Sequence, residues 1–130
     1  LLGLRGVGKT VLLNKIEEMA EAAGHLTSSI EAPEGKALSE LLVPRINQAL
    51  RKLSTSENAK AKAHQALRAL RSFASAFKLS YGDASISVDP EVGVADSGDM
   101  EADLPELFVR VGEAAKAAGK AWTLLIDEVQ

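Results

Sequence analysis

The chain has no cysteine among its 130 residues, which excludes a disulfide framework and a thiolate metal site. Aromatic residues make up only 4% of the sequence, and this shortage argues against a surface on which the bases of a single-stranded nucleic acid stack. No apolar run reaches the roughly 18 residues that are needed to span a bilayer. We therefore expect no membrane contact, and the absence of cysteine fits a cytoplasmic location.

Lysine and arginine are missing from residues 79–106, which carry eight acidic side chains, whereas residues 45–78 carry eight basic side chains and a single acid, Glu57. The net charge of the whole chain is only −3. Neighbouring segments of opposite charge can neutralise each other in a folded protein, and we favour that interpretation. A basic surface for DNA and a surface for a protein partner are the alternatives.

What the chain does have is a complete phosphate-binding motif near its start. Residues 3–10 read Gly-Leu-Arg-Gly-Val-Gly-Lys-Thr and fill every fixed position of the pattern G-x-x-x-x-G-K-[ST]. A loop of this kind presents consecutive backbone N–H groups to the phosphates of a nucleoside triphosphate. The positive N-terminal end of the following helix adds to the attraction.

The residues on either side of this motif fit a strand, a loop and a helix. Leu1 and Leu2 are consistent with the end of a buried strand. Apolar residues then recur at helical spacing, and Gly24 stands where a left-handed helix cap is expected. The apolar positions are Leu12, Leu13, Ile16, Met19, Ala20 and Ala23.

A second motif lies at the far end of the sequence. Residues 122–126, Trp-Thr-Leu-Leu-Ile, are strand-like and are followed by Asp127 and Glu128. Two adjacent carboxylates at the tip of a buried strand are costly unless they are used. Beside a phosphate loop, one would hold the Mg²⁺ that bridges the phosphates, and the other would polarise the water that attacks the terminal phosphorus.

Together these two motifs resemble the Walker A and Walker B motifs of P-loop NTPases. The Asp-Glu pair resembles the branch with a catalytic glutamate, which includes the AAA-type ATPases. Residues 4–13 and 124–130 look most like the origin-recognition, or initiator-type, members of that family from bacteria or archaea. The resemblance is specific at both ends of the chain and vague between about Pro33 and Asp103.

The resemblance implies a role for each motif residue. Lys9 would contact the β- and γ-phosphates of ATP and contribute to catalysis. Thr10 and Asp127 would serve Mg²⁺, and Glu128 would be the catalytic base. The nucleotide-binding residues that it implies are Gly3, Leu4, Arg5, Gly6, Val7, Gly8, Lys9, Thr10 and Val11; Arg5 occupies a variable position and receives no specific role.

The resemblance also implies a three-layer α/β fold around a parallel sheet, of which the chain would be a fragment. The sensor strand, the arginine finger and the strand that separates the Walker A and Walker B strands are not found in it. We therefore expect this fragment by itself to bind ATP weakly and to turn it over poorly or not at all. Unpaired sheet edges would favour self-association or a larger assembly.

The sequence leaves several functions open, among them a DNA-loading initiator, whereas Glu128 beside Asp127 argues against a small-molecule kinase, which needs no water-activating base there. The leading hypothesis is an ATP-binding and ATP-hydrolysing module of an AAA-type ATPase. The alternative is a nucleotide-dependent regulatory switch or scaffold ATPase, with or without an association with DNA. In either case the expected ligands are ATP or ADP with Mg²⁺.

We divide the chain into four segments of one partial domain. Residues 1–32 contain the phosphate loop, its helix and a second strand at 25–31, which a P-loop fold places beside the strand at 122–126. Residues 33–78 are expected to be helical, residues 79–102 to form an acidic β-like insertion, and residues 103–130 to form a helix and the Walker B strand.

Local signals predict where the helices of the middle segment begin and end. A stripe of apolar residues at 38–53 predicts a helix, in which Pro44 either makes a kink or starts a second helix. The triplet Ser54-Thr55-Ser56 offers an N-cap for a further helix at about 57–77.

Other signals concern the second half of the chain. Residues 84–88 and 91–95 alternate as the strands of a hairpin do. Asp103 and Glu106 have the spacing of a capping box at the start of the last helix, which Gly119 would end. Trp122 is expected to pack in the core rather than stack on adenine.

Overall fold

Four helices and two strands make up the regular structure of the residues that the computed structural model describes, namely 7–33, 35, 37–79 and 88–129. For residues 7, 128 and 129 only the backbone is described. In chain order the elements are α1 (Val7–Ala22), β1 (Leu26–Pro33), α2 (Leu38–Leu53), α3 (Lys60–Ala76), α4 (Met100–Ala117) and β2 (Trp122–Val129).

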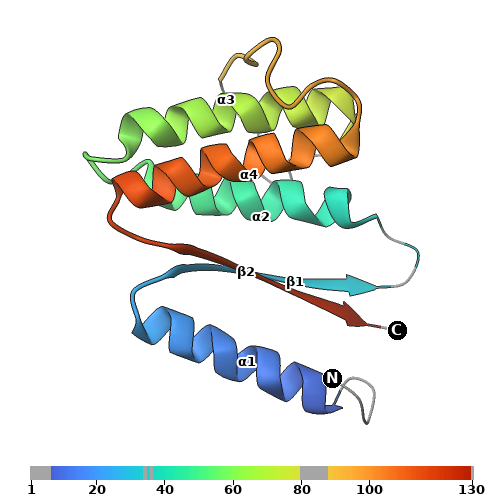
Figure 1. Ribbon diagram of the computed structural model, residues 1–130, viewed down its shortest axis with the longest axis vertical. Coiled ribbons are helices and arrows are strands. Elements are labelled where there is room, and N and C mark those ends of the chain that lie inside the picture. The colour runs from blue at the N-terminus through green and yellow to red at the C-terminus, as the bar shows by residue number, and fades with distance from the viewer. Residues whose placement is uncertain (1–6, 34, 36, 80–87, 130) are drawn as a thin grey trace.

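The two strands lie side by side and run parallel, with Leu26 opposite Trp122 and Pro33 opposite Val129 (Figure 1). This pairing confirms the prediction that the strand after the phosphate-loop helix lies beside the strand that ends in the two acids. The chain is therefore of the mixed α/β class, with helices on both faces of a parallel sheet. Figure 1 shows α1 on one face, α2 and α4 on the opposite face, and α3 beyond them.

Polar and aromatic contacts tie the first residues of the two strands together. The Trp122 indole N–H donates a hydrogen bond to the Ser28 hydroxyl at 3.0 Å, and its ring meets the Phe108 ring edge to face, with centroids 5.5 Å apart. His25 Nδ1 lies 3.0 Å from the Thr123 hydroxyl oxygen. Trp122 thus packs between the sheet and α4, as expected from the sequence.

Both helices that precede a strand end at a glycine in the left-handed region. Gly24 has φ +84° and Gly119 has φ +74°, so the predicted ends of α1 and α4 are confirmed. The N–H of the residue after each glycine reaches back to a carbonyl five residues earlier, from His25 to Ala20 and from Lys120 to Ala115, both at 2.9 Å. These Schellman motifs turn the chain sharply from helix into strand.

The apolar face of α1 is largely open to solvent, although its spacing suggested a core-facing stripe. Of the six predicted positions only Ala20 is buried, while Leu12 is 43% exposed and Met19 is 62% exposed. The described sheet has two strands, which is too narrow a surface to cover a helix of this length. The helical period was predicted correctly, but the extent of burial was not.

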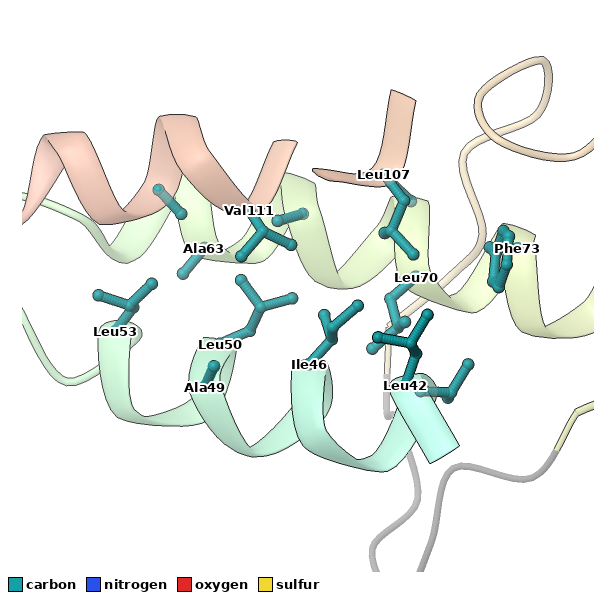
Figure 2. Close-up of a cluster of buried hydrophobic side chains, with 14 of the residues drawn as sticks. Leu42, Ile46, Ala49, Leu50, Leu53, Ala63, Leu70, Phe73, Leu107 and Val111 are labelled. Atoms are coloured by element: carbon teal, nitrogen blue, oxygen red, sulfur yellow. The ribbon is translucent and has the colours of Figure 1, made fainter. Parts of the chain in front are cut away.

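The main core lies between α2, α3 and α4 (Figure 2). Leu42, Ile46 and Leu50 project from α2 toward Phe73 of α3 and Leu107 of α4, and all five side chains are essentially inaccessible to solvent. Burying a side chain of this size stabilises a protein by about 1.5–3 kcal/mol. This layer supports the sheet on the face opposite α1.

α2 runs without interruption through Pro44, so the alternative in which a second helix starts there is wrong. Proline lacks the N–H that would bond to the carbonyl four residues earlier, which is that of Glu40. The loss is confined to one bond in the first half of the helix. The buried side chains on either side of Pro44 hold the two halves in one element.

The predicted N-cap at residues 54–56 is also wrong. The hydroxyl of Ser54 donates to the Arg51 carbonyl, and that of Thr55 donates to the Lys52 carbonyl, each at 2.7 Å. These hydroxyls therefore satisfy the last carbonyls of α2 rather than the first N–H groups of α3. α3 begins only at Lys60.

The acidic segment before α4 does not contain the expected strand at 91–95. The described residues 88–99 form turns and bends, and the partner strand predicted at 84–88 lies almost wholly outside the described residues. Gly93 and Ala95 have positive φ values of 87° and 53°, which interrupt an extended conformation. The Glu91 carboxylate instead lies 3.5 Å from the Arg110 guanidinium on α4.

Asp103 is not the cap of α4 but the buried anchor of this segment. The helix begins earlier, at Met100, and its N-cap is Asp99. One Asp103 carboxylate oxygen accepts from the Ser97 hydroxyl at 2.6 Å and from the Ser97 N–H at 3.1 Å, and the other accepts from the Gly98 N–H at 2.9 Å. Glu106, the second residue of the predicted capping box, accepts from the Ala95 N–H at 3.0 Å.

Burial raises the pKa of the Asp103 carboxyl, but the hydrogen bonds from the Ser97 side chain and from the backbone of Ser97, Gly98 and Asp99 outweigh it, so the pKa lies below its ordinary value. The folded protein therefore favours the ionised carboxylate. The negative charge is held by donors that the preceding loop supplies.

No helix within the described ranges is long and apolar enough to cross a membrane.

We predict that Asp103→Asn lowers the free energy of unfolding by about 1–3 kcal/mol at pH 7, because a buried amide cannot accept all of these hydrogen bonds. The contribution of Asp103 is present above the unfolded-state pKa of about 3.9 and is lost as the pH falls through the lower folded-state pKa. In urea unfolding at a series of acidic pH values, the free energy of unfolding should therefore fall less steeply with decreasing pH in Asp103→Asn than in the wild type. The exposed Glu113→Gln serves as the control, and equal effects of the two substitutions would contradict the prediction.

Candidate functional site

The two motifs that lie far apart in the sequence meet in the structure. The Thr10 hydroxyl, in α1, donates a hydrogen bond to Oδ2 of Asp127, near the end of β2, at 2.9 Å across 117 positions of sequence. Of the predicted site residues, these two are in direct contact. Gly8 and Lys9 lie in the same first turn of α1.

The parallel sheet explains why these residues meet. β1 and β2 both end on the side of the sheet where α1 begins (Figure 1). After α1 crosses the sheet, the turn at Gly24 returns the chain into β1, which fixes the helix along the two strands. The start of α1 therefore lies beside the carboxyl end of β2, which carries Asp127 opposite Glu31 of β1.

Asp127 is buried, with 8% of its surface exposed. A carboxylate in such a place is costly unless donors or cations compensate it. The Thr10 hydroxyl is one donor, and the positive N-terminal end of α1 adds a favourable field. The negative charge of Asp127 thus lies close to the positive N-terminal end of α1, which stabilises it.

The first turn of α1 also has the properties of an anion site. The first N–H groups of any helix lack carbonyl partners within it, and here they belong to residues 7–10. Gly8 and Lys9 are exposed, and a Cβ at Gly8 would meet nothing within 4 Å. Backbone donors, an exposed lysine ammonium group and the helix dipole thus come together at one end of the sheet.

Other residues of the predicted site are described in part or not at all. Gly3, Leu4, Arg5 and Gly6 lie outside the described residues. For Val7 and Glu128 the backbone belongs to α1 and β2, respectively, and nothing is described of the side chain. Val11 follows Thr10 on α1, and its side chain is 65% exposed.

The Thr10 and Asp127 oxygens are hard donors, of the kind that Mg²⁺ prefers. Mg²⁺ is commonly bound by one or two protein groups together with phosphate and water oxygens, so a larger cage is not required. Within the described ranges, no group of three or more His, Cys, Asp or Glu side chains could hold a metal by itself. The pair therefore fits a metal that arrives with a phosphate ligand.

Reasoning from the sequence missed one feature, a polar groove along the outer edge of β1, between α1 and α2. Its sequence signal was weak. Polar residues alternate at Thr27, Ser29 and Glu31, and basic residues recur at Arg45 and Lys52 with the seven-residue spacing of one helix face.

No family model matches this chain, and neither a curated protein nor a solved structure matches it.

We predict that Thr10→Val lowers the free energy of unfolding by about 1–3 kcal/mol, because it removes a hydrogen bond to a buried carboxylate while keeping the side-chain shape. Urea unfolding at pH 7 measures the change. Thr27→Val is the matched control, since the Thr27 hydroxyl also donates to a carboxylate, that of Glu21, but at 3.3 Å and at an exposed site. A loss in Thr27→Val as large as that in Thr10→Val would count against a special role for the Thr10–Asp127 pair.

Proposed function

We propose that this chain is the ATP-binding part of a P-loop ATPase of the AAA type. The observation that carries the proposal is the hydrogen bond between Thr10 and Asp127 at the start of α1. A threonine that ends a complete phosphate-loop motif and an aspartate near the end of an apolar strand are the two groups that such an enzyme needs at one metal. Their contact across 117 positions supports the proposal independently of the spacing of either motif.

The phosphates of ATP would bind at the N-terminus of α1. The N–H groups of the first turn, including those of Gly8, Lys9 and Thr10, provide donors without charge, and the Lys9 ammonium group provides a positive charge beside them. The absence of a side chain at Gly8 leaves room for a phosphate oxygen to approach the backbone. These features account for binding of a polyanion but do not determine which nucleobase the nucleotide carries.

Thr10 and Asp127 would hold Mg²⁺ through their side-chain oxygens. When bound, Mg²⁺ neutralises negative charge on the phosphate oxygens as the terminal phosphoryl group is transferred. The hydrogen bond from the Thr10 hydroxyl to Asp127 already brings these two oxygens together, so both would be available to hold the cation.

Glu128 is the proposed general base. It follows Asp127 in β2, with its backbone opposite Ala32 at the carboxyl end of the sheet. A carboxylate in this position would accept the proton of the water that attacks the terminal phosphorus. The order of elements, in which the helix after the phosphate loop leads to a strand beside the one with Asp127, agrees with the proposed P-loop fold.

We predict that the chain binds ATP in the presence of Mg²⁺ and that Lys9→Ala weakens this binding about 10- to 100-fold, because a hydrogen bond between charged groups contributes about 1.5–3 kcal/mol. Isothermal titration calorimetry measures both affinities. Lys15→Ala is the control, since Lys15 lies on the same helix in an exposed ion pair with Glu18 at 3.8 Å. Equal affinities of the wild type and Lys9→Ala, or an equal loss in Lys15→Ala, would overturn the assignment.

A second prediction separates the metal from the phosphate contacts. Asp127→Asn should bind ATP in EDTA about as well as the wild type, because the backbone donors and Lys9 remain. Adding Mg²⁺ should tighten binding in the wild type and have little effect in Asp127→Asn, since the amide is a poor ligand for this cation. Titrations of both proteins with ATP, with and without Mg²⁺, test this prediction. If Mg²⁺ tightened ATP binding in the variant as much as in the wild type, Asp127 would not be a ligand of the metal.

A further inference from the structure

A groove of about 620 Å³ runs along the outer edge of β1, away from the site described above. Its floor is formed by Thr27 and Ser29 of β1. One wall comes from α1, through Glu17 and Glu21, and the opposite wall comes from α2, through Arg45 and Lys52. α1 and α2 cover opposite faces of the sheet (Figure 1). Because residues of both helices line the groove, it spans the edge of β1 from one face to the other.

The backbone of β1 offers unpaired groups along this groove. The Leu26 N–H donates to the Ala121 carbonyl at 2.8 Å, so Leu26 and every second residue after it turn their N–H and C=O groups toward β2. The groups of Thr27, Ser29 and Glu31 therefore point outward. Within the described residues the sheet contains β1 and β2 alone, which leaves this edge open.

The row of outward-facing N–H and C=O groups on β1 ends at Pro33. This residue occupies the next outward-facing position after Glu31, and proline has no N–H to donate. The usable edge thus extends from Thr27 to Glu31. This span is the same one that the groove covers.

The two walls carry opposite charges. Glu17 and Glu21 lie on the α1 side, whereas Arg45 and Lys52 lie on the α2 side, and all except the half-buried Glu17 are exposed. Among the described residues, no ion pair joins one wall to the other. The charges therefore face the space between the helices, where a ligand can contact both charged walls.

We propose that this groove binds an extended segment of a partner protein, which adds to β1 as a further strand and carries alternating basic and acidic side chains. Successive side chains of a strand point to opposite faces of its sheet. In a segment at this edge, one set would face the acidic wall of α1 and the other the basic wall of α2. Backbone hydrogen bonds to β1 would supply affinity, and the alternation of charge would supply specificity.

The same observations disfavour other occupants. A nucleic acid backbone would be repelled by Glu17 and Glu21. An apolar helix would bury the charged walls without pairing them. A second copy of β1, Leu-Thr-Ser-Ser-Ile-Glu-Ala-Pro, has one acidic and no basic side chain, so it cannot form ion pairs with both charged walls.

The test uses a capped synthetic peptide of eight residues, the length of β1, in which lysine and glutamate alternate. Its control has the same composition, with the lysines and glutamates in two separate blocks. Fluorescence anisotropy at low salt measures binding, since screening weakens such contacts. We expect the alternating peptide to bind at least about tenfold more tightly, a difference of about 1.4 kcal/mol. Equal binding of the two peptides would overturn the proposal.

Reversing the acidic wall in Glu17→Lys/Glu21→Lys should abolish binding of the alternating peptide and create binding of an all-glutamate peptide, which the wild type should not bind. The control Glu57→Lys/Glu113→Lys changes the net charge equally at exposed positions elsewhere and should leave the preference intact. If the first variant does not fold, Arg45→Glu/Lys52→Glu reverses the other wall, and an all-lysine peptide replaces the all-glutamate one. Failure of the reversed variant to change its preference, or an equal change in the control, would contradict the proposal.

Amide hydrogen exchange distinguishes strand addition from a loose electrostatic contact. The N–H groups of Thr27, Ser29 and Glu31 should gain protection when the alternating peptide is bound, because they then donate to its carbonyls. Protection that is absent from all three would overturn the strand arrangement. The proposal does not depend on ATP binding, so Lys9→Ala should retain peptide affinity whatever its affinity for nucleotide.

Discussion

The parallel pairing of β1 with β2 is the constraint on which the rest of this structure depends. Parallel neighbours cannot be joined by a tight turn, so the chain must return to the starting end of the sheet before β2 begins. α2, α3 and α4 make up this return, and they bury their own core on one face of the sheet. α1 is left to the other face, with its first turn beside the carboxyl ends of both strands. The contact between Thr10 and Asp127 is a product of that arrangement.

Features that depend on local chemistry could be predicted from the sequence. Gly24 and Gly119 ended their helices as expected, because a residue without a Cβ can adopt the left-handed cap conformation at little steric cost. The strand at 122–126 and its parallel neighbour were also found, since apolar composition and the order of elements leave few alternatives. Thr10 and Asp127 were both named as site residues because each belongs to a recognisable motif.

Features that depend on competition between partners were predicted wrongly. The hydroxyls of Ser54 and Thr55 could accept from the first N–H groups of α3 or donate to the last carbonyls of α2, and in the structure they donate to α2 carbonyls three residues back. Asp103 had the spacing of a cap, yet the loop at 97–98 brought three hydrogen-bond donors to it and left the cap to Asp99. The periodicity of α1 indicated an apolar face but not how much of it the sheet would cover. In each case the outcome depends on which of several possible partners or surfaces lies closest in the fold, and the spacing of residues along the sequence does not show this.

The distance in sequence between β1 and β2 has a consequence for the order of folding. Residues 34–121 separate the end of one strand from the start of the other. Closing a loop of that size costs entropy before any strand hydrogen bond forms, whereas α2 and α3 meet across a short connection. The helical layer is therefore expected to consolidate first and to serve as the template on which the strands align. By this order, the carboxylate of Asp127 reaches Thr10 only in the last stage of folding.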